Sequence, residues 1–115
     1  MSGHEFLAKA WSNGQRSSSG AGYGLRISAA DRDRFFERVW RSVTLRLEAG
    51  EATVIAEVNC AKASFWDGTC RELICKEIGR WFIDNGLAPW PPGEPPGFRM
   101  RPIGNRTFEV RHVND

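Results

Sequence analysis

Three cysteines and two histidines are the residues of this chain best suited to bind a metal or to act as nucleophiles. Cys60, Cys70 and Cys75 include no pair separated by two residues, and His4 and His112 lie near opposite ends of the chain. This spacing matches no common metal-binding pattern, so the sequence predicts no metal site. A site would require the fold to bring Cys60, Cys70 and His112 together.

Cys70 is also a candidate reactive thiol. It falls in the first turn of a predicted helix and precedes Arg71, so the helix dipole and the guanidinium charge would both favour its thiolate. The same position lies on the apolar stripe of that helix, where a small buried cysteine is common. Packing is the preferred interpretation, and a reactive thiol is the alternative.

Other signs of catalysis are weak. The glycine-rich run at residues 20–24 could bind phosphate only if it led into a helix, but an apparent strand follows and no Gly-Lys-Ser/Thr is present. Asp31 and Asp33 face different ways on a predicted helix and make no carboxylate pair. We therefore predict no catalytic residue and no cofactor. Catalytic groups need not be neighbours in sequence, so the preferred interpretation is a protein that is not an enzyme, and an enzyme is the alternative.

The chain contains five tryptophans, and their positions separate them into two groups. Trp40 and Trp81 lie on the apolar stripes of predicted helices and are expected in the core. Trp11, Trp66 and Trp90 lie in loops or at the ends of elements, where aromatic side chains either cover the core or form a binding surface. Covering the core is preferred. In the alternative, Trp66 and Trp90 form an aromatic wall that meets a partner or lines a small-ligand pocket.

Arginine outnumbers lysine thirteen to three, which favours planar and bidentate contacts. Four arginines are expected on the outer face of the sheet: Arg46, Arg99, Arg101 and Arg111. They could pair across strands with glutamates or contact the phosphates of a nucleic acid. Sheet-based nucleic-acid binders also present aromatic residues on that face. The predicted outward positions here are threonine and glutamate, so pairing with glutamate is preferred.

The strongest helical pattern covers residues 70–85. Thr69 is placed to cap this helix, and Ile74, Ile78 and Trp81 recur at the helical period. Glycine and proline follow and would end it. The positions left for water are Glu72, Lys76, Gly79 and Arg80.

A second, shorter helix and two hairpins complete the pattern. Ser28 and Asp31 have the residue types of a helix start, and about three turns are expected after them. Residues 43–58 and 98–110 alternate apolar and polar side chains on both sides of a glycine-containing turn, which predicts two β-hairpins.

Length and composition predict one domain, residues 1–115. Residues 12–22 are expected to form a mobile Gly/Ser loop, and residues 89–97 a proline-rich connector. No apolar run approaches the roughly 18 residues of a membrane span. We expect a cytoplasmic protein without a membrane partner, because an odd number of cysteines suits a reducing compartment.

These elements predict an α+β fold. Alternation in the strands gives each one buried and one exposed face, which is typical of antiparallel sheets. We expect a two-layer sandwich, in which two amphipathic helices pack on one face of a mainly antiparallel sheet of about five strands.

The sequence contains no ribonucleoprotein motif, zinc-finger spacing or nucleotide-binding fingerprint. We expect a small binding or assembly module that contacts a protein partner or itself, as a possible homodimer. The alternatives are nucleic-acid binding through the arginines, which the net charge of +2 does not favour, and a small-ligand pocket lined by loop tryptophans.

Replacing Trp81 with alanine should lower the free energy of unfolding by about 3–5 kcal/mol, because its side chain is expected to be buried. Urea denaturation followed by circular dichroism measures this change. A loss below about 1 kcal/mol would show that the helix stripe does not face the core.

Overall fold

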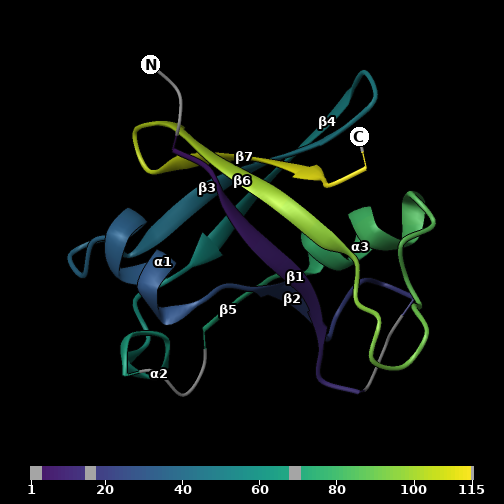
Figure 1. The fold of residues 1–115 in the computed structure, drawn as a ribbon, viewed down its shortest axis with the longest axis horizontal. Helices are drawn as coiled ribbons and strands as arrows, with labels where there is room; N and C mark the ends of the chain where they lie inside the picture. The colour runs from purple at the N-terminus through teal and green to yellow at the C-terminus, as the bar shows by residue number, and fades with distance from the viewer. Residues whose placement is uncertain (1–3, 15–17, 68–70, 115) are drawn as a thin grey trace.

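Alternating apolar and polar residues produce strands along most of the chain. The computed structural model describes residues 4–14, 18–67 and 71–114, which form seven strands and three helices (Figure 1). The strands are β1 (Phe6–Ser12), β2 (Tyr23–Arg26), β3 (Ser42–Ala49), β4 (Ala52–Asn59), β5 (Glu72–Ile74), β6 (Gly97–Gly104) and β7 (Thr107–His112). The helices are α1 (Ala29–Phe35), α2 (Ala63–Trp66) and α3 (Lys76–Asp84).

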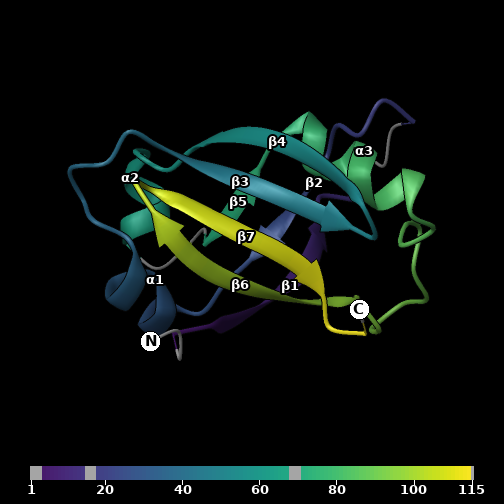
Figure 2. The ribbon, with the colours of Figure 1, turned by 90° about the horizontal axis from the view of Figure 1, so that it is seen from above.

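All of these strands belong to one mixed sheet with the order β4-β3-β7-β6-β1-β2-β5. Neighbouring strands are antiparallel except β3 and β7, which run parallel with Leu45 opposite Phe108 and Leu47 opposite Val110. The sheet curls until its edge strands β4 and β5 approach each other, and it wraps around a common interior (Figures 1 and 2). The fold is therefore mainly β, a nearly closed barrel.

The two-layer α+β sandwich predicted from the sequence is wrong. The helices do not cover one face of the sheet: α1 and α2 lie toward one end of the barrel and α3 toward the other (Figure 2). Helix α3 has nine residues and is only about 13 Å long, too short to cover a sheet. The sheet instead buries its own inner face by curling. Within the described ranges, no helix is long and apolar enough to cross a membrane.

Inward-facing side chains from all the strands fill the barrel. The largest fully buried ones on strands are Leu25, Val43, Leu45, Leu47, Val58, Leu73, Phe98, Met100 and Phe108. This inner surface is apolar on every strand, which makes burial by closure favourable.

The region predicted as one long helix divides into a strand and a helix. β5 pairs with β2, with Leu73 opposite Leu25, and both side chains are completely buried. Glu72, expected in water, is buried beside β2, where its carboxylate lies 2.8 Å from the guanidinium of Arg26. Residues 72–74 could also continue the helix, but they pair with the free edge of β2 and form a strand instead. The predicted cap Thr69 lies outside the described residues.

The second half of that prediction is confirmed, because Ile78, Trp81 and Phe82 of α3 are buried. Gly79, however, does not face water. It is buried against Gly20, so that a Cβ atom added to Gly79 would overlap the carbonyl oxygen of Gly20. Two glycines thus allow the loop before β2 to approach the backbone of α3. Residues 15–17 of the predicted mobile loop lie outside the described residues.

Several other local predictions are confirmed, but Trp40 lies beyond the end of α1 and is only partly buried, so it is not on a helix stripe in the core. The Ser28 hydroxyl accepts a hydrogen bond from the N–H of Asp31 at 3.0 Å and starts α1, which has seven residues instead of three full turns. Both hairpins form, β3–β4 and β6–β7. The second turns at Asn105 and Arg106, which both have positive φ angles, as a two-residue hairpin turn favours.

Gly79→Ala should lower the free energy of unfolding by about 1–3 kcal/mol, because the added methyl group would displace the Gly20 backbone. In an open helix the same change would stabilise the protein by about 1 kcal/mol. Urea denaturation shows whether the substitution raises or lowers the free energy of unfolding. Glu77→Ala, at an exposed position of α3, is the control and should change stability by less than about 1 kcal/mol. A more stable Gly79→Ala protein would contradict this packing.

Candidate functional site

Aromatic side chains cluster at both ends of the barrel. At the α1 and α2 end, Phe36 stacks on Phe108 with 4.9 Å between ring centroids and contacts Phe65 at 5.5 Å. At the α3 end, Phe82 stacks on Phe98 at 5.3 Å. A loop tryptophan that joins either cluster helps to exclude water from the core.

Trp66 belongs to the first end. Its side chain is 8% exposed, and its Nε1 donates a hydrogen bond of 2.9 Å to the carbonyl oxygen of Cys60. The guanidinium groups of Arg32 and Arg38 lie 5.6 and 5.0 Å from the indole centroid, within the range of cation–π attraction. Trp66 is therefore held in place by the fold.

Trp90 belongs to the other end. It lies in the loop after α3, partly buried, and contacts the rings of Tyr23 at 5.8 Å and Phe82 at 6.1 Å. Helix α2, which carries Trp66, lies at the opposite end of the barrel (Figure 1). Trp66 and Trp90 consequently do not form the aromatic wall that the sequence suggested.

Trp11 is the third candidate tryptophan. It lies near the end of β1, opposite Gly24 of β2, and is partly exposed. Among the described residues it makes no aromatic ring contact. It therefore remains available at the surface, apart from the other two.

The four candidate arginines do lie together on the outer face, on the adjacent strands β3, β7 and β6. Arg46 lies 3.0 Å from the carboxylate of Glu48, and Arg101 and Arg111 lie 2.9 and 3.6 Å from that of Glu109. Arg99 donates to the carbonyl oxygen of Val113 at 3.2 Å. Pairing with glutamate therefore occupies three of the four, but only Arg101 with Glu109 pairs across strands as predicted, and the other two pairs form within β3 and β7.

Glu57, on the neighbouring strand β4, pairs with hydroxyl groups and accepts a hydrogen bond from each of two of them. The distances are 2.6 Å from Thr44 and 3.0 Å from Ser42. These donors stabilise the carboxylate and hold the pKa of Glu57 below its ordinary value.

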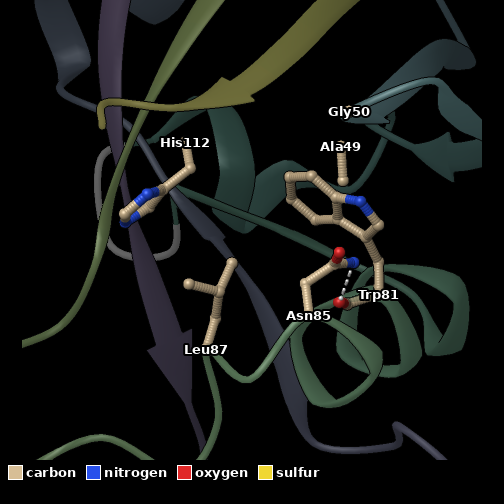
Figure 3. A pocket seen from close by; sticks show the side chains of 6 residues that line it. All are labelled: Ala49, Gly50, Trp81, Asn85, Leu87 and His112. Atoms are coloured by element: carbon tan, nitrogen blue, oxygen red, sulfur yellow. Dashed lines mark hydrogen bonds between the residues drawn. The ribbon is translucent and has the colours of Figure 1, made fainter. Parts of the chain in front are cut away.

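A cavity of about 390 Å³ lies at the α3 end of the barrel (Figure 3). It is lined by Ala49 and Gly50 of the β3–β4 turn, Trp81 and Asn85 at the end of α3, Leu87, and His112 at the end of β7. These residues come from separate parts of the chain with no common spacing, so no sequence pattern pointed to them. We call this space the end cavity.

The outer edge of β4 is the second feature that the sequence analysis missed. β4 pairs only with β3 among the described strands. Residues 52–55 are exposed, including Val54 at 37% and Ile55 at 56%. The run Ala52–Ala56 contains no charge between Glu51 and Glu57, a signal that was visible in the sequence. We call Ala52–Ala56 the β4 edge segment.

Among the described residues, which include Cys60, Cys75 and His112, no group of three potential metal ligands is present. Cys60 is completely buried, and its Sγ lies 3.6 Å from the Trp40 carbonyl oxygen. Burial raises the pKa of the Cys60 and Cys75 thiols. Cys70, the candidate reactive thiol, lies outside the described residues.

No protein-family model, curated protein or solved structure matches this chain. Function must therefore be inferred from the geometry of the described residues.

The Cys60 and Cys75 thiols should react slowly with Ellman's reagent, because a raised pKa leaves little thiolate near neutral pH. In a Cys70→Ser variant, we expect both remaining thiols to react at least about tenfold more slowly than free cysteine. The unfolded variant is the control and should react at the ordinary rate. Rapid reaction of the folded variant would contradict the burial of Cys60 and the partial burial of Cys75. The difference between the wild type and this variant gives the reactivity of Cys70.

Proposed function

We propose that this protein is a non-catalytic binding and assembly module that associates with a second copy of itself through the β4 edge segment. The observation that carries the proposal is an uncharged, exposed strand edge with two aliphatic side chains, Val54 and Ile55. Backbone N–H and C=O groups on such an edge are free to pair with another strand.

Edge strands of proteins that stay monomeric usually carry charges, prolines or bulges that prevent this pairing. The β4 edge segment has none of these: its residues are Ala, Thr, Val, Ile and Ala, and its pairing with β3 is regular. The other edge of the sheet differs, because β5 has only three residues. The two edges are therefore not equivalent, and β4 is the one suited to binding.

A second copy fits the segment because the segment is self-complementary. In an antiparallel pairing centred on Ile55, each Ile55 lies opposite its own copy and Val54 lies opposite Ala56. Glu57 lies opposite Thr53, so no like charges meet across the contact. Such a two-fold contact closes on itself and gives a dimer rather than a fibre.

Nucleic-acid binding through the outer arginines stays a prediction from the sequence. The ion pairs of Arg46, Arg101 and Arg111 weigh against it, because phosphate would have to compete with carboxylates already in place.

A cytosolic location also belongs to the proposal. It is supported by the odd number of cysteines and by the free thiols of Cys60 and Cys75. Reducing compartments keep such thiols unpaired.

Ile55→Lys should weaken the dimer by about tenfold or more, which corresponds to ~1.4 kcal/mol, because two lysines would lie opposite each other across the contact. Sedimentation equilibrium over a concentration series measures the dissociation constant. Leu7→Lys is the matched control: Leu7 is also an exposed aliphatic residue, but β1 lies between β6 and β2 and has no free edge.

A mixture of the Ile55→Lys and Ile55→Glu proteins provides a second, independent test. Opposite charges then face each other, so the mixture should associate more tightly than either variant alone. A wild-type protein that stays monomeric at high concentration would refute self-association. An Ile55→Lys protein that dimerises like the wild type would refute pairing through β4.

A further inference from the structure

The end cavity is placed where a small barrel can accept a ligand. Binding sites are common at the mouths of β-barrels, and their volumes range from about 300 to 1,000 Å³. The end cavity, at about 390 Å³, lies at the lower end of this range and suits a molecule of one or two rings. It opens beside the β3–β4 turn, whereas the α1 and α2 end of the barrel is filled by stacked phenylalanines.

The lining of the end cavity favours an uncharged ligand. Among the described residues that form it, none is an aspartate, glutamate, lysine or arginine. An ionised ligand would lose its hydration here without meeting an opposite charge, which is costly. The Trp81 ring, Leu87 and Ala49 supply apolar surface, and Asn85 and His112 supply polar groups.

Trp81 contributes a polar atom that lacks a partner. The residue is 3% exposed, and its Nε1 is buried with no hydrogen-bond acceptor among the described residues. Buried indole N–H groups normally find an acceptor, because leaving one unpaired is costly. Figure 3 shows this nitrogen on the side of the ring nearest Ala49.

Asn85 supplies the complementary group. Its Nδ2 donates a hydrogen bond of 2.8 Å to the Trp81 carbonyl oxygen, which fixes the orientation of the amide. The amide oxygen then points toward the indole ring (Figure 3), where it can accept a hydrogen bond from a ligand.

We propose that the end cavity binds a small, uncharged, planar heteroaromatic molecule. Its N–H donates to the Asn85 amide oxygen, and its ring-nitrogen acceptor receives the Trp81 N–H. Because Nε1 is enclosed in the unliganded protein, the corner at Ala49 and Gly50 moves aside on binding. Gly50 is exposed, and the space where its side chain would lie is open, so the corner has room to move.

Two probes of nearly the same shape distinguish the hydrogen bond to the Trp81 N–H from the hydrogen bond to the Asn85 amide oxygen. Benzimidazole carries both an N–H donor and a ring-nitrogen acceptor, whereas indole carries the donor alone. At slightly alkaline pH, where both are uncharged, ligand-observed NMR titrations should give about tenfold tighter binding of benzimidazole to the wild-type protein. In Trp81→Phe, which keeps a ring but removes the N–H, this preference should disappear.

A cavity-filling variant tests the location. Ala49→Leu should abolish binding of both probes while the melting temperature stays equal or rises, because the new side chain occupies the space. Ala30→Leu, at an exposed position of α1, is the matched control and should bind both probes like the wild type. The Ile55→Lys protein should also bind both probes like the wild type. The proposal for the end cavity can therefore be refuted without refuting the dimer contact, and the reverse also holds.

Two results would overturn the proposal. One is the absence of binding of either probe to the wild-type protein. The other is binding that Ala49→Leu leaves unchanged, which would place the probes elsewhere on the molecule.

Discussion

The parallel pairing of β3 with β7 is the contact on which the rest of the fold depends. Each strand belongs to a hairpin formed by neighbouring residues, and the backbone hydrogen bonds between Thr44–Glu48 and Thr107–Arg111 join the two hairpins into one sheet. The pairing places Leu45 and Leu47 beside Phe108 and Val110 on the same inner face. Without it, each hairpin would expose an apolar face that no described helix is long enough to cover.

Closure of this sheet explains why the helices lie at the two ends of the barrel. A curled sheet buries its inner face along its length but leaves two ends open, and the aromatic residues of helices and loops fill them. At one end, Phe36 and Phe65 close the interior with Phe108. At the other, α3 meets the small residues Ala49 and Gly50, which leaves the end cavity. The small residues at the tip of the β3–β4 hairpin thus leave space at the α3 end, although aromatic rings cluster there as well.

The incomplete closure of the sheet has a second consequence, at its edges. The ends of the strand order, β4 and β5, approach each other, but β5 is short. On the longer edge, β4, the side chains of Val54 and Ile55 stay exposed. The outer face of β3, β6 and β7 instead carries ion pairs such as Arg101 with Glu109. The apolar β4 edge segment therefore contrasts with the ion-paired outer face of these three strands.

Local structure could be predicted from the sequence wherever neighbouring residues decide it. The two hairpins and the Ser28 cap follow from turn chemistry and alternation, and Ile78 and Trp81 are buried as the helical period requires. The cross-strand pair of Arg101 with Glu109 was also foreseeable, since alternation places both on one face.

What the sequence could not reveal depends on contacts between distant segments. The same residues at 72–74 fit a helix or a strand, and only the exposed edge of β2 decides for the strand. The closeness of Gly20 and Gly79, and the meeting of Ala49, Trp81 and His112 around one cavity, likewise join segments far apart in the chain. By itself the sequence determined which residues turn, alternate and favour burial. The tertiary structure alone decided which strands are neighbours, because backbone hydrogen bonds between strands are nearly independent of side-chain identity.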